Sequence, residues 1–201
     1  SGATVIPVIS PDTSRLVEDL ISQASESIDI EQAYITNQSD GTFNPFLARA
    51  IEAAGNGVRV RILLDSYYYN TEGEEDNDEL VSVLNTLARR DGIPLEARCA
   101  DLARNNIEKI HNKGVIVDRR RVLVSSINWN TNSPTFNREA GVIIDHPDVG
   151  EYYSRVFEDD WEAGDVGRSV GPDLQKMGIA VVIVGILVMG WVWRRKTVWR
   201  R

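Results

Sequence analysis

Residues 111–118 read HNKGVIVD, three charged or titratable side chains around a short apolar run. The run 114–117 is typical of a buried strand. Side chains alternate between the two faces of a strand, so His111 and Lys113 would point the same way, about 7 Å apart. At that spacing an imidazole can attack phosphorus or transfer a proton, while an ammonium offsets charge on the phosphate oxygens. Asp118 can support a neighbouring histidine or lysine.

More polar side chains follow at the ends of the next apolar segments. Ser126 and Asn128 come at the end of the segment 122–126. Their hydroxyl and amide groups can donate hydrogen bonds to phosphate oxygens. Glu139 opens a further strand-like segment, where its carboxylate can accept a hydrogen bond from an imidazole N–H. These residues, together with His111 and Lys113, form a candidate phosphate-handling site.

The rest of the first 163 residues alternates between strand and helix patterns. We predict helices over 13–25, 45–54, 80–90 and 149–160, with an acidic loop at 72–79. We predict strands over 4–9, 27–35, 58–65, 95–100, 110–118, 122–126 and 140–145, the fifth and sixth forming a hairpin around Arg119, Arg120 and Arg121. This alternation indicates an α/β fold in which helices cover a largely buried sheet.

Composition excludes several classes of protein. The chain has 201 residues and one cysteine, Cys99, which rules out a disulfide framework within the chain or a cysteine-built zinc site. The net charge is −8, but six basic residues follow position 173, leaving 16 basic against 30 acidic residues and a net charge of −14 before that point. Such an acidic body argues against broad electrostatic binding of nucleic acid. The second histidine, His146, is expected to be a surface turn residue.

The C-terminal part reads as a membrane anchor. Residues 177–193 carry no charge, and a helix of this length is at the lower limit for one membrane span. Residues 164–176 read as a juxtamembrane linker and 194–201 as a basic tail. Positive residues favour the cytoplasmic side, so we expect a single-pass protein with the domain of residues 1–163 outside. There are two alternatives: a tail anchor with that domain inside, and a buried core helix.

The motif residues resemble those of the phospholipase D superfamily, the HKD phosphodiesterases. The family pattern H-x-K-x4-D-x6-G-S-x-N fits His111 through Asn128, except that Ser125 stands where glycine is usual. The Asn-Arg-Glu-Ala-Gly stretch at 137–141 also looks like the family's downstream strand. The resemblance covers roughly residues 4–163. It implies a phospholipase D-like sandwich, a mixed β-sheet covered by helices on both faces.

The resemblance also implies roles for these residues and a mechanism. Catalysis would rest on His111, Lys113, Asp118 and Glu139, with Glu139 hydrogen-bonded to the motif histidine, and substrate phosphate would bind to Lys113, Ser126 and Asn128. Two such motifs face each other in one active site and form a phosphohistidine without metal or other cofactor. This chain holds one motif, so the second half is expected from a homodimer partner or from an upstream domain.

We therefore expect a membrane-anchored phosphodiesterase or phosphatidyltransferase acting on phospholipids, similar to cardiolipin synthases. A nuclease of the same family is one alternative, with nucleic acid the less favoured partner because the body is acidic. A non-catalytic half that pairs with another chain, or a membrane-tethered binding domain, is another.

Overall fold

A single mixed sheet organises the chain. Within residues 2–67, 70 and 76–163, which the computed structural model describes, seven strands lie in the order β1-β7-β6-β5-β2-β3-β4. Their bounds are β1 Thr4–Ser10, β2 Ser27–Gln32, β3 Arg59–Leu64, β4 Leu95–Cys99, β5 Lys113–Val117, β6 Arg121–Ser125 and β7 Glu139–Asp145. Strands β2, β3 and β4 run parallel, and all other neighbours are antiparallel.

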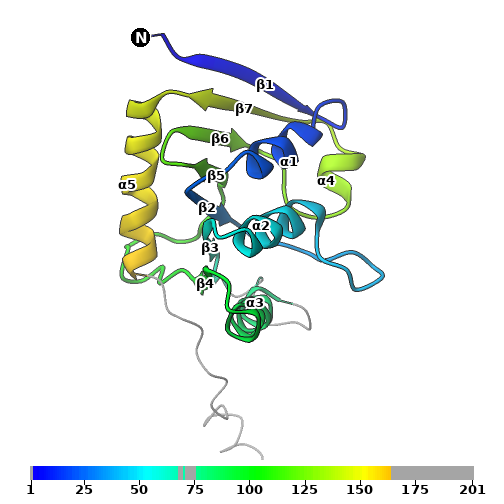
Figure 1. Cartoon of the computed structure of the whole chain (residues 1–201), viewed down its shortest axis with the longest axis vertical. Coiled ribbons are helices and arrows are strands. Elements are labelled where there is room, and N and C mark those ends of the chain that lie inside the picture. Colours follow the sequence, from blue (N-terminus) through cyan, green and yellow to red (C-terminus); the bar gives the residue numbers. More distant parts are fainter. Residues whose placement is uncertain (1, 68–69, 71–75, 164–201) are drawn as a thin grey trace, which may run out of the picture. The chain divides into compact units, whose positions relative to one another are not determined.

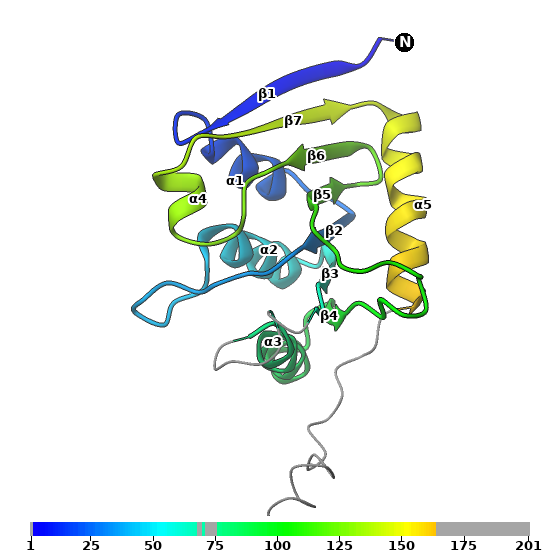
Figure 2. The ribbon, with the colours of Figure 1, turned by 180° about the vertical axis from the view of Figure 1, so that it is seen from behind.

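Helices cover both faces of this sheet (Figures 1 and 2). Helices α1 (Arg15–Ser22), α2 (Pro45–Gly55) and α3 (Asn77–Asp91) lie on one face, and α5 (Pro147–Ala163) lies on the other. The short helix α4 (Asn132–Thr135) belongs to the β6–β7 connection. The predicted α/β fold, with a mixed sheet between two helical layers, is confirmed.

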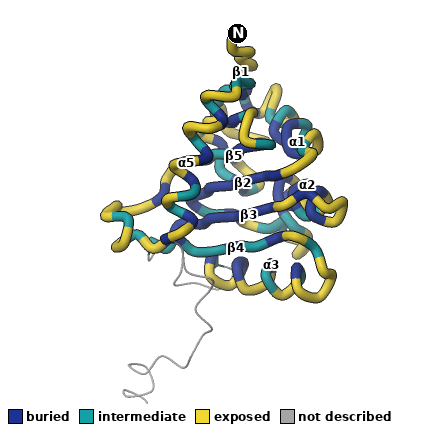
Figure 3. Tube along the Cα trace, turned by 60° about the vertical axis from the view of Figure 1, so that its left-hand side comes forward, coloured by how far each residue is buried: buried dark blue, intermediate teal, exposed yellow. Residues whose placement is uncertain are grey.

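Successive side chains of a strand point to opposite faces of the sheet, which explains why two hydrophobic clusters form. Leu64 and Val115 point into the large cluster under α1, α2 and α3, whereas Leu63 and Ile116 point to the other face and pack with Phe157 of α5. Strands β2 and β3 are buried from both sides, as Figure 3 shows by their dark blue tubes between α5 and α1–α2. This rigid centre supports the strand ends that carry the candidate site.

Several boundaries differ from the sequence-based expectation. Strand β5 begins at Lys113, so His111 precedes the strand instead of lying on it. Helix α3 begins at Asn77, which places Asp78 and Glu79 in its first turn and not in a loop. Acidic side chains in the first turn interact favourably with the helix dipole. A run of acidic residues is therefore compatible with the start of a helix as well as with a loop.

The predicted linker 164–176, membrane span 177–193 and basic tail 194–201 lie outside the described residues. In the part that is described, the helices are too short or too polar to span a bilayer.

The hairpin β5–β6 is held by the carboxylate of Asp118. Asp118 has a φ of 53°, and its side chain accepts hydrogen bonds from the backbone N–H groups of Ser25 (3.1 Å), Glu26 (2.8 Å) and Ser27 (3.0 Å). Burial by itself would raise the pKa of the Asp118 carboxyl, but these hydrogen bonds outweigh burial and hold the pKa below its usual value. The turn is thereby tied to the start of β2.

The arginines of this hairpin are paired locally. Arg119 bonds to Glu151, Arg120 to Asp145 and Arg121 to Asp118. The prediction of a hairpin tip is confirmed, with Arg121 as the first residue of β6. Helix α5 passes so close to the turn that a Cβ atom on Gly150 would lie 2.2 Å from the carbonyl oxygen of Arg119, which requires glycine at that position.

Asp118→Ala should destabilise the domain by about 2–3 kcal/mol, because three backbone donors lose their acceptor. Asp118→Asn keeps one acceptor oxygen and tolerates the same φ, so a smaller loss is expected. The pKa of Asp118 is lowered in the folded state. Its contribution is therefore complete above the unfolded pKa of about 3.9 and is lost as the pH falls through the folded value. Urea unfolding at several pH values measures this. An alanine variant as stable as the wild type at pH 7 would contradict it.

Candidate active site

Strand directions bring the predicted phosphate-handling residues to one end of the sheet. Because β5, β6 and β7 are antiparallel neighbours, the start of β5, the end of β6 and the start of β7 lie together. Lys113 pairs with Ser125, and Ser125 pairs with Gly141. The backbone N–H of Ser126 donates to Ala140. The site residues that these strand ends bring together are His111, Lys113, Ser126, Asn128 and Glu139.

Lys113 is a buried cation at the centre of this end. Lys113 is 4% exposed, and its Nζ donates a hydrogen bond of 2.6 Å to the backbone carbonyl of His111. Burial lowers the pKa of the Lys113 ammonium, and Lys109 adds to this, whereas the carboxylates of Glu139 and Asp65 oppose it. The hydrogen bond to the His111 carbonyl holds this positive charge beside the histidine.

His111 is exposed, and its backbone is fixed by its neighbours in the chain. The N–H of Ile110, which is itself buried, donates to Asp65 Oδ1 at 2.8 Å. The charge of Lys113 lowers the pKa of the His111 imidazole below its ordinary value, with burial acting in the same direction. An imidazole with a lowered pKa is neutral at pH 7 and has a lone pair available for attack.

Glu139 is an ionised carboxylate facing this cation. It accepts hydrogen bonds from Ser126 Oγ (2.5 Å), Ser133 Oγ (3.1 Å) and Asn137 Nδ2 (3.4 Å). The bond from Ser126 is the main reason why the pKa of Glu139 is lowered. Within the described residues its hydrogen-bond partners are these side chains, whereas the resemblance led us to expect the imidazole of His111.

Asp118 and His146 are not brought to this end. Asp118 follows the last residue of β5, at the opposite end from Lys113, where it binds the backbone before β2. The structure thus gives it a hairpin-anchoring contact in place of the expected contact with histidine or lysine. His146 lies in the turn before α5, where its Nδ1 accepts a hydrogen bond from Asp148 N–H at 3.2 Å.

Sequence reasoning missed three residues that shape the site. Asp65 directly follows the buried strand β3, and a carboxylate at the end of a buried strand could have marked it as a candidate site residue. Ser133 bonds to Glu139 and accepts from the N–H of Asn128 at 2.9 Å, but nothing in its local sequence marks it. Glu31 lies on β2 beside the motif and is recognisable only once the strands are paired.

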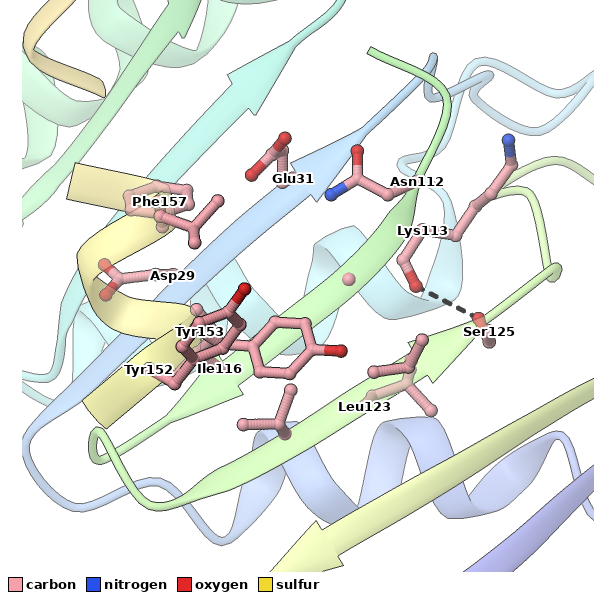
Figure 4. Close-up of a pocket in the computed structure, with 14 residues that line it drawn as sticks. Asp29, Glu31, Asn112, Lys113, Ile116, Leu123, Ser125, Tyr152, Tyr153 and Phe157 are labelled. Atoms are coloured by element: carbon pink, nitrogen blue, oxygen red, sulfur yellow. Dashed lines mark hydrogen bonds between the residues drawn. The ribbon is translucent and has the colours of Figure 1, made fainter. Parts of the chain in front are cut away.

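A cavity of about 260 Å³ adjoins the site between α5 and the sheet. Figure 4 shows Glu31 and Asn112 at one side of it and the rings of Tyr152 and Tyr153 at another. Among the described residues, no group of three histidine, cysteine or acidic side chains is arranged to hold a metal ion.

Comparisons with known proteins agree with this geometry. A family model described as "Cardiolipin synthase, PLD-like domain" matches residues 17–161. The mitochondrial cardiolipin hydrolase of Mus musculus is 28% identical over 123 residues, which are 61% of this chain and 49% of that protein. The 5'-3' exonuclease PLD3 of Homo sapiens is 25% identical over 171 residues, 80% of this chain and 33% of that protein. The chain thus spans half or less of the length of these two relatives.

Among solved structures, the phospholipase D family member Nuc from Salmonella typhimurium superimposes with a TM-score of 0.64 at 26% identity. The match covers 82% of this chain and 97% of Nuc. Since the family model covers most of the chain and the site residues lie together in the same fold, the chain belongs to the phospholipase D superfamily of phosphodiesterases.

Proposed function

We propose that this domain cleaves or transfers phosphodiesters by way of a phosphohistidine. The observation that carries the proposal is a histidine of lowered pKa beside a buried ammonium, His111 next to Lys113. The imidazole supplies a neutral nucleophile, and the ammonium supplies positive charge where the phosphate oxygens become more negative. Asn128 lies at the same end of the sheet, and its side-chain amide can donate to those oxygens. The hydroxyl of Ser126, which lies there too, donates to Glu139 and would reach a phosphate oxygen only by turning away from that carboxylate.

The first step forms one bond and breaks another. A ring nitrogen of His111 attacks phosphorus, and the bond between phosphorus and the leaving alcohol oxygen breaks. A second histidine gives its proton to that alkoxide. Water or an acceptor alcohol then gives a proton back to the second histidine and attacks phosphorus, which releases His111. Water gives hydrolysis, and an alcohol gives a transferred phosphatidyl group.

The second histidine comes, in this proposal, from another copy of the chain. His146 lies in the turn before α5 and does not face His111. Nuc is matched over 97% of its length, so a chain carrying a single such domain exists in the family. An upstream domain is the other possible source, since the exonuclease relative is matched over 33% of its length.

Phospholipid is the substrate class we favour, with residues 177–193 as a membrane-spanning anchor. Support comes from the cardiolipin synthase description of the family model, the cardiolipin hydrolase relative and the uncharged run itself. A nuclease is the second candidate, because an exonuclease is among the relatives. The pairing of Arg119, Arg120 and Arg121 with carboxylates weighs against it, since nucleic acid needs available cations.

His111→Asn should lower turnover of an aryl phosphodiester in EDTA by at least about 10³-fold, because it removes the nucleophile. His146→Asn is the matched control and should keep wild-type turnover. Parallel assays with phospholipid vesicles and with single-stranded and duplex DNA decide between the two substrate classes. An inactive wild-type dimer would support the non-catalytic alternative.

Lys113→Met should raise the pKa of His111 toward its ordinary value of about 6.5, because it removes the charge that disfavours the imidazolium. NMR titration of the two histidine rings measures this, with His146 as the internal reference. A pKa of His111 that stays in place or falls would show that the ammonium does not act on the imidazole.

A heterodimer of wild type and His111→Asn, isolated through two different tags, should be at least about 100-fold less active than the wild-type dimer. The one active site that the two chains share would then lack one of its two histidines, either the nucleophile or the general acid. A heterodimer of wild type and His146→Asn is the control. Half of the wild-type activity in the first heterodimer would mean that each copy works alone.

A further inference from the structure

Glu31 is a buried carboxyl group beside the motif that the proposed mechanism does not use. It lies near the end of β2, is 8% exposed, and stands in register between Gly114 of β5 and Leu63 of β3. Because Gly114 has no side chain, the space above it on that face of the sheet is left to neighbouring groups.

Asn112 occupies that space. A Cβ atom on Gly114 would lie 3.8 Å from Asn112 Nδ2. Figure 4 shows the amide nitrogen of Asn112 turned toward the carboxyl group of Glu31, and the N–H groups of an amide are attracted to a carboxyl group. Asn112 stands between His111 and Lys113 in the chain. Glu31 therefore contacts the segment that presents both catalytic groups.

The arginine Arg61 on the neighbouring strand β3 forms ion pairs with carboxylates other than Glu31. Arg61 of β3 bonds to Asp29 of β2 at 2.8 Å and to Glu158 of α5 at 2.6 Å. Its guanidinium also lies over the rings of Phe157 and Trp161. These contacts hold Arg61 to Asp29 and Glu158, away from Glu31.

The other charged groups around Glu31 are Asp160 of α5 and Lys113 of β5. Asp160 disfavours the ionised form of Glu31. The ammonium of Lys113 donates to the His111 carbonyl, and Figure 4 shows it pointing away from Glu31. Burial, followed by Asp160, raises the pKa of Glu31 to about 7, and the amide group of Asn112 works against that rise. The group changes charge near neutral pH, being ionised above it.

We propose that Glu31 is a positioning residue, whose carboxylate holds Asn112 and thereby orients His111 for attack on phosphorus. An amide N–H is attracted more strongly to a carboxyl group when that group is charged, so the segment is better ordered with Glu31 ionised. The inference rests on the proposed function, because orientation matters only if His111 reacts with phosphate. It predicts that activity rises as the pH passes upward through the ionisation of Glu31.

The side-chain amide of Asn112 reports this contact without any turnover. Its NMR signal in the wild type should titrate with a midpoint near pH 7. Glu31→Gln should abolish that titration and shift the His111 ring signal, while His146 stays in place. Asp160→Asn keeps an acceptor for Asn105, which bonds to Asp160 at 2.7 Å, and should move the midpoint to lower pH. An amide signal that is flat in the wild type, or unchanged in Glu31→Gln, overturns the proposal.

Kinetics then test the consequence for catalysis. Glu31→Gln should lower kcat about tenfold at pH 8 with KM unchanged, and the rise of activity near pH 7 should vanish. Glu31→Asp should restore part of the pH dependence, and Glu52→Gln, an exposed glutamate on α2, is the matched control. Wild-type kcat in Glu31→Gln overturns the proposal. An inactive wild type with a normal Asn112 titration would instead count against the proposed function alone.

Discussion

The buried ammonium of Lys113 is the interaction on which the site depends. Its hydrogen bond to the carbonyl of His111 joins the two groups of the motif, and its charge lowers the pKa of the imidazole. The same charge faces the carboxylate of Glu139, which Ser126 and Ser133 hold ionised. A buried cation is costly to maintain without such partners, and these contacts explain why it is tolerated at the end of a central strand.

The sheet divides the motif between its two ends. Lys113 opens β5 at the end where phosphate would bind, whereas Asp118 follows β5 at the other end and ties the hairpin to the chain before β2. Four strand residues, 114–117, separate the two positions. One short stretch thus places a residue of the candidate site at one end of the strand and a residue that anchors the hairpin at the other. This explains how the two residues can belong to one sequence pattern and have different roles.

Environment, and not residue type, decides the protonation state of three carboxyl groups, those of Glu139, Asp118 and Glu31. Hydroxyl donors lower the pKa of Glu139, backbone N–H donors lower that of Asp118, and burial beside Asp160 raises that of Glu31 to about 7. The three groups are chemically alike in isolation. Their different partners assign one to face the cation, one to hold the fold, and one, in our proposal, to orient the histidine.

Local patterns were enough to predict the α/β class, the β5–β6 hairpin and the motif residues that meet at one end of the sheet, because alternation and spacing are properties of short segments. They did not predict that β5 starts after His111, that Ser133 supports Glu139, or that Glu31 faces Asn112. Those contacts join residues from separate elements, and whether a charge is buried or paired depends on strand order. Tertiary packing alone sets which partners surround a side chain, and so sets its pKa and its role.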